Sequence, residues 1–259
     1  MNIIRKRLIV LFAISAALGL PGCANDYSAK SIEAWVVDAD TKQPLEGVSV
    51  VAHWQLEYGL EGGGRYPFTV METVTDKNGR FTFPAWGPKE VPSSLPSEAR
   101  LKNIDPGVLL FKAGYDTFYE AKKQDRRPLS SFGGHGPSVR EWYANGEKIE
   151  LRLLKSVPLE ARVYSHTDRQ SDVEYAAGRL EGFDSNLRLL SPRGNCAWHN
   201  VIQALVASER ARRTLFKADE AAARKGLYNQ ETLYQELVRN DSMLSPLCGS
   251  PKSLLKIEE

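Results

Sequence analysis

The sequence predicts an α+β protein in which an N-terminal seven-stranded β-sandwich is followed by a helical C-terminal region. Two observations lead to this fold class. Up to about Lys155, short β-branched and aromatic runs alternate with turn residues, a pattern typical of a β-sandwich. After about Ser156, apolar residues recur at the spacing of one face of a helix.

Each expected strand is a short run bounded by turn residues. The runs cover 32–37, 48–56, 68–75, 80–83, 108–111, 117–119 and 148–153. Asp76-Lys77-Asn78-Gly79 predicts a hairpin, because Asn-Gly tolerates the positive φ of a tight turn. We expect the glycine-containing stretches 58–67 and 124–145 to be loops, the first of them mobile, and long loops are often where binding occurs.

Three apolar stripes predict three helices. The stripes consist of Val173, Ala176, Ala177 and Leu180 behind Ser171-Asp172 as N-cap, of Trp198, Val201, Ile202 and Leu205, and of Leu233, Tyr234, Leu237 and Val238. We expect the charged, alanine-rich stretch 209–225 to be solvated, either continuing the second helix or connecting two helices. Because each helix has only one apolar stripe, the helices should pack on the sandwich or on one another.

The start of the chain has the composition of a secretory signal. Arg5-Lys6-Arg7 precedes an apolar run from Leu8 to Leu20, which is too short to span a bilayer comfortably. The run ends in Leu20-Pro21-Gly22-Cys23, which resembles the lipobox of bacterial lipoproteins. The resemblance implies that 1–22 is removed and that Cys23 carries the lipid. Residues 23–30 would then be a polar tether, and Ala24 in place of an Asp resembles an outer-membrane address facing the periplasm.

Removal of the signal would change the charge of the chain. The full sequence has a formal charge of +2, and loss of the three cations Arg5, Lys6 and Arg7 leaves −1. Nucleic acid is therefore not an expected partner, because no net positive field remains to release counterions. Beyond the signal no apolar stretch is long enough to span a membrane, so attachment would rest on the lipid alone.

The two remaining cysteines, Cys196 and Cys248, form an even pair. In an oxidising compartment such a pair predicts a disulfide. On the chain-entropy model, a bridge that closes a loop of this length stabilises by about 4 kcal/mol. The alternative is two buried thiols.

Three segments resemble the carboxypeptidase regulatory-domain-like family, a transthyretin-type sandwich. Residues 36–50 (Val-Val-Asp-Ala-Asp-Thr-Lys-Gln-Pro-Leu-Glu-Gly-Val-Ser-Val) are similar to its opening strand, turn and second strand. Residues 75–81 (Thr-Asp-Lys-Asn-Gly-Arg-Phe) resemble its next hairpin, and 110–115 (Leu-Phe-Lys-Ala-Gly-Tyr) a later strand. The resemblance implies such a domain over 31–155, which leaves a helical region over 156–250 and a loose tail over 251–259. Members of the family are scaffolds that serve as accessory, adhesive or sugar-binding modules.

Residue patterns that would support catalysis are missing from the sequence. None of the histidines, His53, His135, His166 and His199, has a Glu at the spacing of a metallopeptidase, so we expect no metal and no cofactor. A Gly-x-Ser-x-Gly elbow and a P-loop are also missing. Cys196 lies three residues before His199, but papain-like enzymes place the histidine far downstream, where this sequence has none. We therefore predict no catalytic residues and no enzymatic activity.

The remaining candidate ligand-binding residues are aromatic: Trp54, Trp86, Trp142 and Tyr143. An exposed platform of such rings could stack on a sugar of peptidoglycan or of a surface polysaccharide. The other interpretation, which we favour, is core packing, because large aromatic side chains dominate cores. The sequence thus predicts a non-catalytic outer-membrane lipoprotein that binds a protein partner or acts as a scaffold. A carbohydrate-binding module is the alternative.

Overall fold

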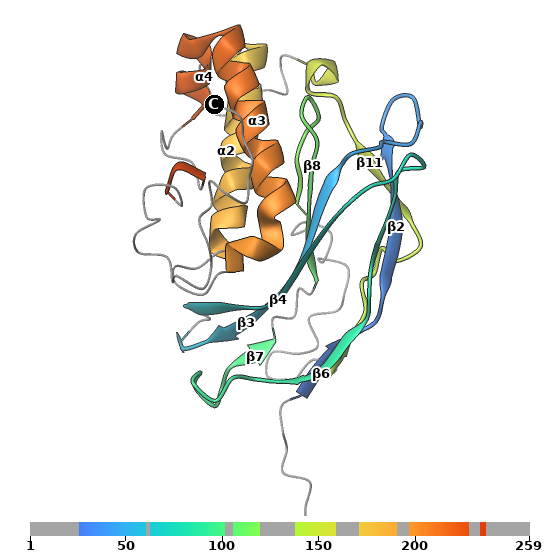
Figure 1. Cartoon of the computed structure of the whole chain (residues 1–259), viewed down its shortest axis with the longest axis vertical. Helices are drawn as coiled ribbons and strands as arrows, with labels where there is room; N and C mark the ends of the chain where they lie inside the picture. Colours follow the sequence, from blue (N-terminus) through green and yellow to red (C-terminus); the bar gives the residue numbers. More distant parts are fainter. Residues whose placement is uncertain are drawn as a thin grey trace, which may run out of the picture.

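The computed structural model describes residues 26–60, 63–101, 106–119, 138–158, 171–190, 197–227 and 234–236. A β region comes first along the chain and a helical region follows it, which confirms the predicted α+β class (Figure 1). In the described part of the chain, no helix is both long enough and apolar enough to cross a membrane.

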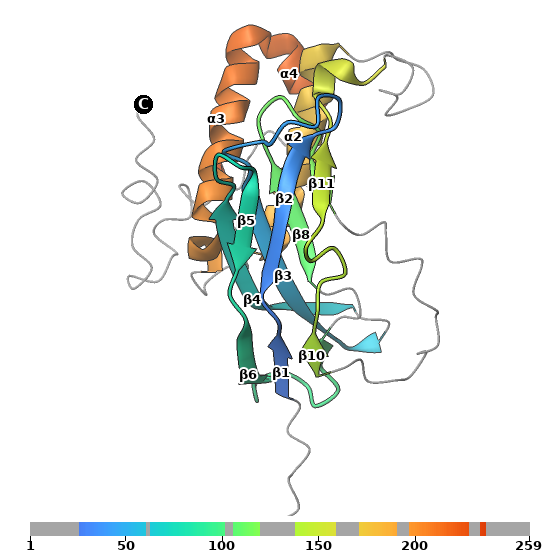
Figure 2. The same ribbon diagram turned by 90° about the vertical axis from the view of Figure 1, so that its right-hand side faces the viewer.

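The first β layer is built from strands that follow one another end to end. β1 (Asp26–Ala29) precedes β2 (Ile32–Asp38), β5 (Arg80–Phe83) precedes β6 (Trp86–Glu90), and β10 (Val139–Arg140) precedes β11 (Lys148–Leu151). The strand order is β10-β1-β6 at one end and β11-β2-β5 at the other (Figure 2). Each such pair therefore acts as one strand with a break in its middle.

The second β layer contains β4 (Gly64–Val74), β3 (Ser49–Tyr58), β8 (Gly107–Phe111) and β9 (Phe118–Tyr119), hydrogen-bonded in that order. The two-residue β7 (Arg100–Leu101) pairs with the end of β3. Seven of the eleven described strands match the predicted runs: β2, β3, β4, β5, β8, β9 and β11. The four others, β1, β6, β7 and β10, were not predicted.

The second β layer is buried on both faces. Val50, Ala52 and Trp54 of β3 point into the core between the two β layers, whereas Val51 belongs to a second core on the other side. β8 divides in the same way, because successive side chains of a strand point to opposite faces. The molecule therefore has three layers, with the helices covering the outer face of the β3–β8 sheet (Figure 1).

The helical layer contains α2 (Asp172–Leu190), α3 (Ile202–Ala218) and α4 (Glu220–Gly226). The short 3₁₀ turns η3 (Leu154–Ser156) and η5 (Ala197–Val201) precede α2 and α3. As expected, Ser171 caps α2, accepting at Oγ from the N–H of Glu174 at 3.2 Å. The layer docks through stacking of Phe183 on Phe111 of β8, with ring centroids 4.6 Å apart.

Two expectations about loops are wrong in part. The stretch 58–67 is strand at both ends, because Tyr58 of β3 pairs with Gly64 of β4 and 64–67 belong to β4. Part of the expected tether is also strand: 26–29 forms β1, which pairs with β6 and β10. In both cases backbone pairing and burial, here of Tyr27 and Ala29, outweigh a locally polar or glycine-rich composition.

Several predictions concern residues outside the described ranges. These are Cys23, Cys196 and Cys248, most of the stretch 124–145, and the tail 251–259. Of the third predicted helix only 234–236 is described, and it is helical.

Candidate functional site

The segments that carry the family resemblance meet at one end of the sandwich. The Asp38 carboxylate accepts from the N–H groups of Asp40 and Thr41, at 2.9 and 2.8 Å, and from the Tyr115 hydroxyl at 3.0 Å. These hydrogen bonds lower the pKa of Asp38, and the one from the N–H of Thr41 has the largest effect. Burial, followed by the Asp38 contact, raises the pKa of Tyr115. The first and third segments are thus joined across the two β layers.

The second segment is joined to the first in a similar way. Thr75 Oγ1 accepts from the N–H of Val48 at 2.9 Å and donates to the carbonyl of Leu45 at 2.6 Å. Asp76 Oδ1 accepts from the N–H groups of Asn78 and Arg80 at 2.8 and 2.9 Å, which closes the predicted hairpin. The polar residues of these segments therefore hold turns together.

The candidate aromatic residues do not form one platform. Trp54 and Trp142 are 1% and 3% exposed and belong to the core between the β layers. Trp86 is half-buried and meets Trp54 edge to face, with centroids 5.3 Å apart. Tyr143, at 36%, is the most exposed of the four. The two buried rings offer no free face to a sugar, so the alternative of a platform does not hold at Trp54 or Trp142. These two residues pack in the core, which is the interpretation that we favour.

Within the described ranges, no three His, Cys, Asp or Glu side chains are grouped so that they could hold a metal ion. His53 is buried in β3 at 5% exposure, and His199 is half-buried in η5. Cys196, the thiol considered beside His199, lies outside the described residues.

A remote carboxylate positions the helical layer on the sandwich. No side chain caps α3 from its N-cap position, Val201. Instead Glu72, on β4, accepts from the N–H of Gln203 at 2.9 Å and from that of Ala204 at 3.1 Å. A carboxylate suits this place because the first N–H groups of a helix lack partners and carry partial positive charge. Burial is the largest influence on Glu72 and raises its pKa.

A buried polar cluster lies between α2 and α3. Its members are Asp184, Ser208, Glu209 and Arg212, all at most 5% exposed. The Ser208 hydroxyl donates to Asp184 Oδ1, while Oδ2 has no hydrogen-bond partner among the described residues. Burial raises the pKa of Asp184 to about 6 and lowers that of Arg212. The expectation that 209–225 is solvated is therefore wrong for Glu209 and Arg212, which face α2.

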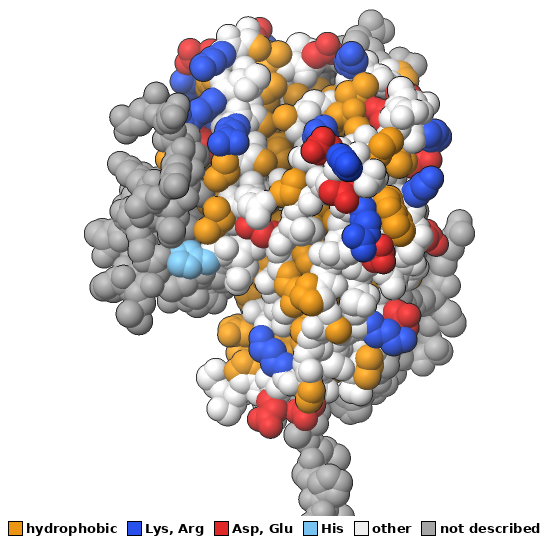
Figure 3. All heavy atoms as spheres, turned by 45° about the vertical axis from the view of Figure 1, so that its right-hand side comes forward, with side chains coloured by type: hydrophobic (Ala, Val, Ile, Leu, Met, Phe, Trp, Pro, Cys, Tyr) orange, Lys and Arg blue, Asp and Glu red, His pale blue; other side chains and the backbone are white. Residues whose placement is uncertain are grey.

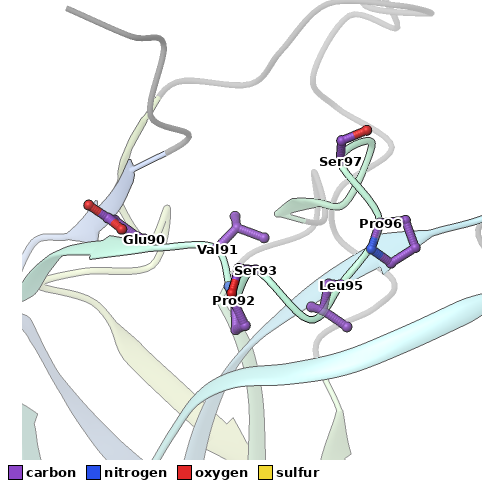
Figure 4. Close-up of a pocket in the computed structure, with 7 residues that line it drawn as sticks. All are labelled: Glu90, Val91, Pro92, Ser93, Leu95, Pro96 and Ser97. Atoms are coloured by element: carbon purple, nitrogen blue, oxygen red, sulfur yellow. The ribbon is translucent and has the colours of Figure 1, made fainter.

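A small hollow lies beside β1, close to the start of the described chain. It has a volume of about 310 Å³ and is lined by seven residues at and after the end of β6: Glu90, Val91, Pro92, Ser93, Leu95, Pro96 and Ser97 (Figure 4). Val91 and Leu95 also pack against the core between the β layers. The Pro-Ser pattern of this segment indicates turns, but the sequence argument did not single it out.

The helical layer presents basic side chains to solvent. Arg210, Lys217, Arg224 and Lys225 of α3 and α4 are exposed. Lys and Arg side chains gather over the upper part of this layer (Figure 3). Arg224 is partly neutralised by Glu220, its neighbour one helical turn earlier, at 2.7 Å. This surface lies away from the end of the sandwich where β1 begins (Figure 1).

Comparison with known proteins adds little to this geometry. No family model matches the chain, and no curated protein does. A 9R-lipoxygenase from Cyanothece PCC8801 is similar to it in structure, with a TM-score of 0.26 and 11% sequence identity. The likeness covers 74% of this chain and 25% of the lipoxygenase chain, so this chain spans a quarter of that protein. A TM-score this low supports no conclusion about fold or function.

Proposed function

We propose that this chain is a non-catalytic envelope lipoprotein that is anchored through Cys23 and presents its helical layer to a protein partner. The observation that carries the proposal is the run Leu20-Pro21-Gly22-Cys23 behind a basic and apolar leader, followed almost at once by the first strand of a folded body. An outer-membrane position facing the periplasm goes with this proposal, as does a disulfide between Cys196 and Cys248.

The arrangement of the layers supports the proposal. β1 starts three positions after Cys23, at one end of the sandwich. The helices cover the outer face of the second β layer, and their basic surface lies towards the other end (Figure 1). An anchor at β1 would therefore leave the helical layer accessible. Its exposed cations fit a partner with an acidic surface, because complementary charge speeds encounter and selects partners.

The anchor is tested by Cys23→Ser in the full chain. We expect the variant to keep its leader and to carry no acyl group, because the thiol that accepts the lipid is gone. A chain that is still shortened and still sediments with membranes would refute the lipoprotein assignment.

The partner surface is tested by photo-crosslinking in intact envelopes. A photoreactive residue in place of Arg210 on α3 should give a reproducible adduct, while the same residue in place of Ser156, in η3, serves as the exposed control. The double variant Lys217→Glu and Lys225→Glu should weaken the adduct from Arg210. Equal adduct patterns from both positions, unaffected by charge reversal, would count against the helical layer as the partner surface.

A further inference from the structure

The anchored end of the molecule has little freedom to move away from a membrane. Ala24 and Asn25 alone separate Cys23 from Asp26, the first residue of β1. Even fully extended, these three steps of chain span only about 10 Å. One headgroup layer of a bilayer is about 5–8 Å thick, so the spacer is hardly longer than the layer in which it starts.

The segment that lines the hollow is held close to this spacer. Asp26 is in register with Glu90 across the β1–β6 pair, which places their Cα atoms about 5 Å apart. Val91 follows Glu90 directly, so its Cα lies within about 20 Å of that of Cys23. The anchor therefore holds the whole segment near the membrane surface.

We call 91–97 the anchor-side loop. It reads Val-Pro-Ser-Ser-Leu-Pro-Ser and contains no charged residue. Backbone hydrogen bonds shape it: the N–H of Leu95 donates to the carbonyl of Pro92 at 3.0 Å, and that of Ala99 to Pro96 at 2.9 Å. Pro96 and the serines are exposed, while Val91, Pro92 and Leu95 are half-buried. The loop thus presents a pre-shaped surface with few groups that are costly to dehydrate.

We propose that the anchor-side loop rests on the headgroup layer of the bilayer, so that the lipid and the loop together fix the orientation of the body. This rests on the proposed lipid anchor at Cys23. The exposed residues Glu90 and Glu98 flank the loop, and acidic side chains are visible at this lower end of the molecule (Figure 3). Because anionic lipids would repel them, the surface suits zwitterionic lipids.

The test uses the full acylated chain in vesicles of phosphatidylethanolamine and phosphatidylcholine. An environment-sensitive fluorophore is attached at Ser94→Cys in the loop, or at Ser156→Cys in η3 as the matched exposed control. Lipids with a nitroxide in the headgroup region serve as quencher. The labelled parent chain, which keeps Cys196 and Cys248, provides the blank. We expect several-fold stronger quenching at position 94 than at 156.

A second variant separates contact from tethering. Insertion of a ten-residue Gly-Ser spacer after Asn25 leaves the anchor intact but lets the body diffuse away from the surface. Because the loop itself contacts the headgroups, quenching at position 94 should stay above that at position 156. A fall at position 94 to the level of position 156 would mean that the short tether alone held the loop near the bilayer, and would refute the contact. Flotation of the vesicles reports the anchor independently. A chain that does not float refutes the lipid anchor. A chain that floats with equal quenching at both positions refutes the loop contact alone.

Discussion

The buried carboxylate of Asp184 should make the stability of this protein depend on pH. Its pKa rises from 3.8 to about 6, chiefly because burial disfavours the charged form. The folded chain therefore holds the proton more tightly than the unfolded chain. Stability from this group is fully present below pH 3.8 and is lost as the pH rises towards 6. At about 1.4 kcal/mol per pKa unit, the loss is about 3 kcal/mol.

Asp184→Asn tests this directly. Asparagine keeps the shape and can still accept from the Ser208 hydroxyl, but it does not titrate. The assay is urea unfolding of both chains between pH 3.5 and pH 7.5, followed by tryptophan fluorescence. Groups common to both chains cancel in the difference between their free energies of unfolding. This difference should move by about 3 kcal/mol in favour of the variant as the pH rises from 4 to 7.

Ser208→Ala provides the control at the same site. It removes the hydrogen bond that lowers the pKa of Asp184 but keeps the titrating group, so the pH-dependent loss should remain and move to higher pH. A difference between wild type and Asp184→Asn that stays constant from pH 4 to pH 7 would refute the reasoning, because it would mean that Asp184 has similar pKa values in the folded and unfolded chains.

Three further predictions concern the joints between layers and the turns. Glu72→Ala should lower the free energy of unfolding by about 1–2 kcal/mol in the same urea titration, because the first N–H groups of α3 lose their acceptor. Glu72→Gln should cost less at pH 7, because glutamine can still accept these hydrogen bonds and burial already disfavours the charged carboxylate. Asp38→Asn should destabilise at pH 7, and the loss should shrink as the pH falls below 3.8, since the pKa of Asp38 is lowered and its contribution disappears when it is protonated. Tyr115→Phe should show the same pH trend in thermal melts. Gly79→Ala should lower the free energy of unfolding more than Gly114→Ala. Both glycines have a positive φ, 71° and 85°, so the backbone strain is similar. Of the two, only at Gly79 would an added Cβ lie 2.3 Å from a backbone carbonyl oxygen, that of Val36. Equal losses for the two glycine variants would contradict this.

Local patterns predicted much of the fold because the responsible interactions are short-range. The alternation in 32–37 and in 80–83 places β2 and β5, and Asn78-Gly79 places the turn before β5. Ser171 and the stripe that follows it place the start of α2. In each case the signal is a turn, a cap or a repeating spacing of apolar residues, and it involves only a few neighbouring positions.

The strands that were missed depend on partners far along the chain. Asp26–Ala29 carries little β propensity, yet it is a central strand because β6 and β10 lie on either side of it. The glycines of the stretch 58–67 predict a loop, but register between β3 and β4 makes residues 58 and 64–67 strand. Propensity is a weak guide where pairing across a sheet decides the outcome.

The chain alone determined the order of strands before helices, and the turns, because these depend on residue type and close spacing. The leader with Cys23 is a prediction of the same kind. Only the tertiary structure decided which polar groups are buried. Glu72 accepts from the N–H of Gln203 in α3, 131 residues further along the chain. Asp184 comes close to Ser208 and Arg212 only because α2 packs against α3. The tertiary structure also turned Trp54 and Trp142 into core residues. Residue type favours core packing for large aromatic side chains, but the burial of each one is a property of the assembled layers.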